Sequence, residues 1–105
     1  MKYQIKYQFD PGSGICLWSN NEASRLRYGY PINHWELNIS ENTKRYLQYL
    51  ITWFDTSIDW SAPSDFDDYW SRDELDRFRL AAKKGLDMLR LELSGDYSII
   101  DAYEC

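Results

Sequence analysis

The carboxylates between Asp55 and Asp76 are the side chains whose type and spacing offer the most chemistry in this sequence. The 22 residues of this stretch hold eight of the chain's 17 acidic residues and a single base, Arg72. Large aromatic residues stand among those acids: Trp60, Phe66, Tyr69 and Trp70. Carboxylates in this setting can pair with the cations of a partner, chelate a metal ion, or work in pairs as general acid and base.

Metal chelation is the least favoured of these uses. A calcium loop of the EF-hand type needs a glycine at its sharp turn and a distant glutamate. The aspartates Asp65, Asp67 and Asp68 lack that glycine, and Pro63 stands just before them. We therefore expect no metal ion and no other cofactor.

The groups needed for catalysis are scarce. His34 is the single histidine and stands beside Trp35, a setting typical of a packing residue. Cys16 lies between Ile15 and Leu17, and these apolar neighbours favour a small buried hydrophobe over an activated thiolate. Acid–base catalysis by two carboxyl groups needs them about 5–9 Å apart across a cleft. We expect a protein that is not an enzyme, with a small carboxylate-dependent hydrolase as an alternative.

Charge is distributed unevenly along the chain. Residues 1–52 carry four acids and six bases, whereas residues 53–105 carry thirteen acids and six bases. An acidic surface repels phosphate, so direct binding to nucleic acid or to an anionic membrane is disfavoured. Basic protein partners are favoured, because opposite potentials accelerate encounter.

Aromatic residues make up 17% of the chain, and such residues serve both cores and interfaces.

Three further features predict a cytoplasmic protein. The apolar runs are only a few residues long, too short to span a membrane. The chain opens on an alternating pattern and not on a signal peptide. Its two cysteines, Cys16 and Cys105, do not make the framework of a disulfide-rich secreted domain.

The strands of the fold are predicted mainly from the alternation of apolar and polar residues. Residues 3–9 alternate between apolar and polar side chains, which predicts a strand with one exposed face. A turn over residues 10–14 leads to a second strand, residues 15–18, as the hairpin partner of the first. A last strand over residues 97–100 follows Gly95 and is expected to join the same sheet.

Helices are predicted between these strands. The first runs from about Asn20 to Tyr28, with Ser19 as its N-cap and with Ala23 and Leu26 turned inward. The second starts at Asn38 or Ser40 and ends near Thr56.

The third helix runs from Arg72 to about Leu93, with Ser71 as its N-cap. Three of the clustered acids fall in its first turn, where the helix dipole favours negative charge: Asp73, Glu74 and Asp76. The elements together predict an α+β fold in a single domain of residues 1–105. We expect a small antiparallel three-stranded sheet, made of the N-terminal hairpin and the C-terminal strand, with three helices packed on it.

Four short segments follow one another along residues 14–93. They read Ile15-Cys16-Leu17-Trp18-Ser19, Tyr28-Gly29-Tyr30-Pro31-Ile32, Ser57-Ile58-Asp59-Trp60 and Trp70-Ser71-Arg72-Asp73-Glu74. In the order and spacing of these segments the chain resembles small immunity proteins of bacterial contact-dependent growth inhibition systems. It departs from that pattern at Tyr69, where a proline is expected, and over residues 64–68, where a proline-rich approach is expected.

The resemblance implies a cytoplasmic protein that binds the C-terminal toxin domain of a large secreted effector, and such toxins are often nucleases such as RNases. A nuclease needs a basic cleft to hold phosphate, and an acidic, aromatic surface complements such a cleft. We therefore predict an immunity protein that neutralises a cognate toxin by tight stoichiometric binding and has no small-molecule substrate. The predicted partner-binding residues are Asp59, Trp60, Asp65, Phe66, Asp67, Asp68, Tyr69 and Asp73.

Other readings of the sequence stay open. A general interaction adaptor would have no toxin partner, and a hydrolase would hold paired carboxylates in a deep pocket. A nucleic-acid mimic would space its acids like phosphates along a ridge. The face around Tyr30, His34 and Trp35 is the alternative contact surface for a protein partner.

Overall fold

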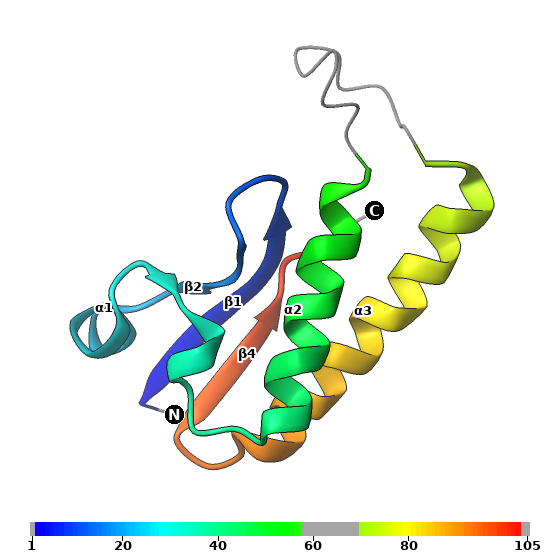
Figure 1. Cartoon of the computed structure of the whole chain (residues 1–105). Helices are drawn as coiled ribbons and strands as arrows, with labels where there is room; N and C mark the ends of the chain where they lie inside the picture. The colour runs from blue at the N-terminus through cyan, green and yellow to red at the C-terminus, as the bar shows by residue number, and fades with distance from the viewer. Residues whose placement is uncertain (1, 58–69, 104–105) are drawn as a thin grey trace.

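The computed structural model describes residues 2–57 and 70–103 (Figure 1). In chain order the elements are β1 (Tyr3–Asp10), β2 (Ile15–Ser19), α1 (Glu22–Tyr28), β3 (Pro31–Ile32), the 3₁₀ helix η1 (His34–Glu36), α2 (Glu41–Asp55), α3 (Arg72–Glu92) and β4 (Tyr97–Asp101). They form an α+β fold in which α2 and α3 lie side by side and cover one face of a sheet.

The sheet has four strands in the order β3-β2-β1-β4. β1 pairs antiparallel with β2 and parallel with β4, and β3 pairs antiparallel with β2. The predicted three-stranded antiparallel sheet is therefore wrong, both in the number of strands and in the direction of the C-terminal strand.

The direction of β4 follows from the helix that precedes it. α3 runs antiparallel to α2 and ends beside the start of β1 (Figure 1). The chain then reverses over residues 93–96, where Gly95 takes a φ of 91°. The amide of Tyr3 donates to the carbonyl of Asp96 at 2.8 Å. β4 thus begins where β1 begins and runs in the same direction, a relation that local alternation does not contain.

The strand β3 is too short to be read from periodicity. It is formed by two residues, of which Ile32 pairs with Leu17 and Pro31 with Trp18. The amide of Ser19 donates to the carbonyl of Tyr30 at 2.7 Å. A proline is tolerated here because β3 is an edge strand of the described sheet.

The predicted N-cap of α1 and the inward position of Leu26 are wrong, whereas the predicted end of the helix at Tyr28 is confirmed. Asn21, and not Ser19, is its N-cap, and the Asn21 side chain accepts a hydrogen bond from the Ser24 amide at 3.0 Å. Ser19 is instead a buried residue of β2. Leu26 is 81% exposed, and Ser24 takes the inward position by donating from Oγ to the Gln4 carbonyl at 2.9 Å.

The core lies between the sheet and the two long helices. The alternate residues of β1 are buried as predicted, and Ser71 is confirmed as the N-cap of α3. Ser40, one of the two expected starts of the second helix, is the N-cap of α2. Each of the two long helices buries an apolar stripe against the sheet, which consists of Leu47, Leu50 and Ile51 in α2 and of Phe78, Ala82, Leu86 and Leu89 in α3. None of the helices formed by residues 2–57 and 70–103 is long and apolar enough to cross a membrane.

Candidate protein-binding surface at the acidic end

We call one end of the molecule the acidic end. There the β1–β2 turn, the C-terminus of α2 and the N-terminus of α3 come together (Figure 1). Its described acids are Asp10, Asp55, Asp73, Glu74 and Asp76. Residues 58–69 connect α2 to α3 and add four aspartates without any lysine or arginine.

Of the predicted partner-binding residues, Asp73 is the one that the structure describes. The others lie outside the described residues: Asp59, Trp60, Asp65, Phe66, Asp67, Asp68 and Tyr69. Asp73 sits in the first turn of α3, where its side chain is 84% exposed and meets Arg77 Nε at 3.3 Å. An exposed pair of this kind contributes about 0–1 kcal/mol, so the Asp73 carboxylate stays accessible to a partner.

Two described residues hold the ends of α2 and α3 together. The indole Nε1 of Trp70 donates to Oγ1 of Thr56 at 2.8 Å. Trp53, in the last turn of α2, donates from its own Nε1 to Glu74 Oε2 at 3.4 Å. These bonds join the residues on either side of residues 58–69 and fix where that acidic segment leaves and rejoins the fold.

Below these bonds lies an aromatic cluster contributed by β1, α2, α3 and the C-terminal segment. It consists of Phe9, Trp53, Phe54, Trp70, Phe78 and Tyr103. The ring of Phe78 is fully buried at the centre, with the other five ring centroids 5.0–5.7 Å away. Rings packed at these distances form a dense core. In this cluster the high aromatic content serves packing and gives the acidic end a rigid base.

Asp55 has a role that the sequence did not reveal. Its Oδ1 accepts a hydrogen bond from the Gly12 amide at 2.8 Å, across 43 positions of sequence. Gly12 has a φ of 82°, a conformation that favours glycine. This bond attaches the β1–β2 turn to the end of α2. No local pattern could have indicated the bond, because turn and helix lie far apart in the chain.

The described residues that could support catalysis are poorly placed for it. His34 is buried, and burial together with the charge of Lys44 lowers the pKa of its imidazole below the usual value. Cys16 is buried as predicted, and burial raises the pKa of its thiol, which opposes formation of a nucleophilic thiolate. Since His34 is buried, the alternative contact face presents Tyr30 and Trp35 but little of the histidine ring.

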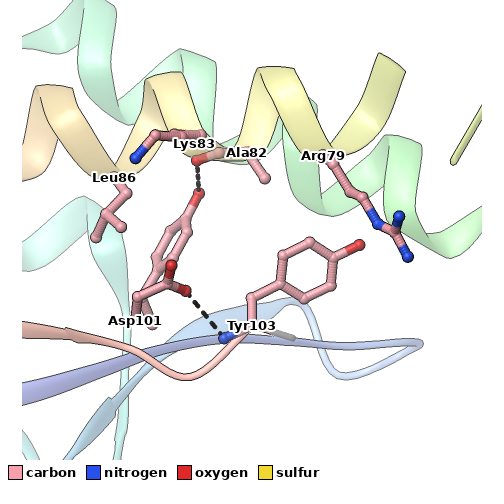
Figure 2. A pocket seen from close by; sticks show the side chains of 7 residues that line it. Arg79, Ala82, Lys83, Leu86, Asp101 and Tyr103 are labelled. Atoms are coloured by element: carbon pink, nitrogen blue, oxygen red, sulfur yellow. Dashed lines mark hydrogen bonds between the residues drawn. The ribbon is translucent and has the colours of Figure 1, made fainter. Parts of the chain in front are cut away.

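Figure 2 shows a hollow between α3 and the end of β4, which we call the Asp101 hollow. Its volume is about 260 Å³, and it is lined by Tyr7, Arg79, Ala82, Lys83, Leu86, Asp101 and Tyr103. The hydroxyl of Tyr7, one of the lining residues, donates to the Ala82 carbonyl at 2.7 Å. Asp101 is the one carboxylate among these lining residues, so the hollow does not hold the carboxylate pair that a hydrolase of the predicted type needs.

No protein-family model and no curated protein matches this chain.

Proposed function

We propose that this chain is an immunity protein that binds a basic toxin domain, such as a nuclease, and neutralises it by tight one-to-one association in the cytoplasm. The observation that carries the proposal is the concentration of acid at one end. Eight acids and one base lie between Asp55 and Asp76. The resemblance of residues 14–93 to immunity proteins of contact-dependent growth inhibition systems supports the same function.

The acidic end is suited to binding because its base is rigid. The bond between Trp70 and Thr56 and the aromatic cluster beneath it hold the ends of α2 and α3 in place. A partner therefore meets an anionic surface whose attachment points need little ordering on association, which lowers the entropic cost of binding. Carboxylates on such a surface pair with lysines and arginines of the partner.

The two kinds of predicted contact residue have different tasks in this proposal. The carboxylates of Asp65, Asp67 and Asp68 attract a cationic cleft and speed association. Trp60 and Tyr69 supply large side chains of the type that anchors protein interfaces and slows dissociation. A nuclease whose phosphate-binding cleft is covered in this way loses access to its substrate.

The test uses the toxin domain encoded next to this chain in its genome. Cells that express the toxin should survive when they also express the wild-type chain, and the purified partners should form a one-to-one complex. Replacing Asp65, Asp67 and Asp68 together by alanine should lower the association rate constant about tenfold at low salt. Replacing Trp60 or Tyr69 by alanine should mainly raise the dissociation rate constant.

A matched control removes the same charge elsewhere. Glu22, Asp87 and Asp96 are exposed and lie outside the acidic end, so their triple alanine variant should associate within about twofold of wild type. Equal association rate constants for the two triple variants would show that the acidic end is not the contact surface. The face of Tyr30 and Trp35 would then be the next surface to test. Failure of the wild-type chain to bind or protect would end the immunity proposal itself.

A further inference from the structure

The outer edge of β4 presents backbone groups that the described sheet does not use. β4 is an edge strand among the described residues. The amide of Tyr3 donates to the Asp96 carbonyl, and the amide of Ala102 donates to the Tyr7 carbonyl. Backbone groups alternate in direction along a parallel strand, so those of Tyr97, Ile99 and Asp101 point away from β1. An edge of this kind can accept a further strand.

Arg90 of α3 reaches down to the middle of this edge. Its Nε and Nη2 both donate to the Ile99 carbonyl, at 3.3 and 2.8 Å. The two bonds confirm that the backbone carbonyl of Ile99 points away from β1. A carbonyl oxygen has two lone pairs, and the two donors of Arg90 use both at Ile99. The outward amides of Tyr97, Ile99 and Asp101 and the carbonyls of Tyr97 and Asp101 are not involved in these two bonds.

Two hollows flank Arg90 along the edge. The Asp101 hollow lies at the C-terminal end of β4 (Figure 2). A second hollow of about 380 Å³, the Tyr97 hollow, lies at its N-terminal end and is lined by Arg90, Leu93, Ser94, Gly95, Tyr97, Ser98 and Ile99. Strand addition needs both a row of backbone groups and spaces for alternate side chains of the added strand. The β4 edge has both.

More bases than acids line the two hollows beside this edge. Arg79 and Lys83 line the Asp101 hollow, and Arg90 lines the Tyr97 hollow. These are three of the six bases found in residues 53–105, a half of the chain with thirteen acids. Asp101 is the one acid that lines either hollow. Arg79 is paired with Asp76 at 3.6 Å, which leaves Lys83 and Arg90 as the lining cations that an added strand can meet.

We propose that the edge of β4 binds an extended segment of a partner protein that carries acidic side chains, and that this segment adds to the sheet as a fifth strand. The outward amides of Tyr97, Ile99 and Asp101 and the carbonyls of Tyr97 and Asp101 hydrogen-bond the segment. Its alternate side chains enter the two hollows, where carboxylates meet Lys83 and Arg90. The site takes a ligand whose charge is opposite to that of a toxin bound at the acidic end, so the inference goes beyond the proposed function and does not depend on it.

The test is a titration of the full-length, ¹⁵N-labelled protein with a capped hexapeptide of alternating glutamate and valine. We expect the amide resonances of Tyr97, Ile99 and Asp101 to shift and their hydrogen exchange to slow. A peptide with lysine in place of each glutamate is the matched probe for charge and should bind about tenfold more weakly or not at all.

Two variants of α3 test whether binding of the glutamate peptide depends on a positive charge at Lys83, beside the β4 edge. Lys83→Glu should weaken binding of the glutamate peptide about tenfold. Lys84→Glu makes the same charge change next to it, but Lys84 lies over the Tyr46 ring of α2 at 5.4 Å and should leave the affinity within about twofold.

Three results would overturn the proposal. One is the absence of shifts at the three amides with millimolar glutamate peptide. Another is equal binding of the lysine peptide, which would show strand pairing without charge recognition. The third is protection of the same amides in a peptide-free sample that sediments as a dimer, because the occupant of the edge would then be a second copy of this chain.

Discussion

The acidic end and the β4 edge lie along the same helix, α3, yet they are built in different ways. The acidic end rests on packed rings, with Phe78 at their centre and the Trp70–Thr56 bond above them. The β4 edge rests on the alternation of backbone groups along a strand and on the bonds from Arg90 to Ile99. The same helix therefore serves two different surfaces, because its first turn is acidic whereas Lys83 and Arg90 line the hollows beside β4.

The largest expected effect comes from breaking the packed base of the acidic end. Phe78→Ala removes a fully buried ring, and a change of this kind costs about 3–5 kcal/mol of unfolding free energy. Urea denaturation followed by tryptophan fluorescence measures it. Leu80→Ala, two residues away but 74% exposed, is the control and should change stability by less than about 0.5 kcal/mol. Similar losses in both variants would contradict the description of the cluster.

A smaller effect is expected at the wall of the Asp101 hollow. Tyr7→Phe removes the hydroxyl that donates to the Ala82 carbonyl at 2.7 Å. The carbonyl belongs to a helix and keeps its helical partner, so the loss should be about 0.5–1.5 kcal/mol. The same denaturation experiment measures it. Binding of a basic partner to the acidic end should not change, and a drop in that binding would show that the two regions are coupled.

The end of the helix pair opposite the acidic end provides a test by pH. Glu92 accepts hydrogen bonds from the Thr43 hydroxyl and from the amide and hydroxyl of Ser40, and these bonds hold the pKa of its carboxyl below the ordinary value of 4.5. A carboxyl whose folded pKa is lowered stabilises the protein above its unfolded pKa, and that contribution is lost as pH falls. Wild type should thus lose more thermal stability than Glu92→Gln between about pH 5 and about pH 3.

The matched control for this experiment is Glu41→Gln. Glu41 is an exposed residue of α2 that pairs with Arg45 at 3.5 Å, and its variant should follow the wild-type curve on acidification. Parallel curves for wild type and Glu92→Gln would show that the bonds from Ser40 and Thr43 do not depend on the charge of Glu92.

The smallest expected effect on stability is at the acidic end itself. Asp73→Asn removes one exposed ion pair with Arg77 and one favourable charge in the first turn of α3, together about 0.5 kcal/mol. Calorimetry measures the change in Tm. The same substitution should slow association with a basic toxin domain by about twofold. A large loss of stability without any kinetic effect would make Asp73 a structural residue and not a contact residue.

The long elements were predictable because their signals are local. Alternation along residues 3–9 gave β1, and the apolar stripes with the caps Ser40 and Ser71 gave α2 and α3. The seven-residue helix α1 was harder, because too few positions define its inward face. There the hydrogen bond from Ser24 to the Gln4 carbonyl outweighs the burial of Leu26.

The features that sequence reasoning missed depend on contacts between distant segments. The parallel direction of β4 is decided by where α3 ends, and β3 exists because two residues meet β2. The bond from Gly12 to Asp55 likewise joins residues far apart in the chain, and the Asp101 hollow brings residues of α3 together with residues of β1 and β4. The candidate site was recognisable as an acidic, aromatic segment, and seven of its eight predicted contact residues lie outside the described residues.

The most direct test of charge-directed binding is the salt dependence of association between this chain and the neighbouring toxin domain, measured by stopped-flow fluorescence. The association rate constant of the wild type should fall about tenfold or more between low and physiological salt. The triple alanine variant of Asp65, Asp67 and Asp68 should associate more slowly at low salt, and its rate constant should depend much less on salt. A wild-type rate constant that does not change with salt, or one that equals the variant's throughout, would contradict the account.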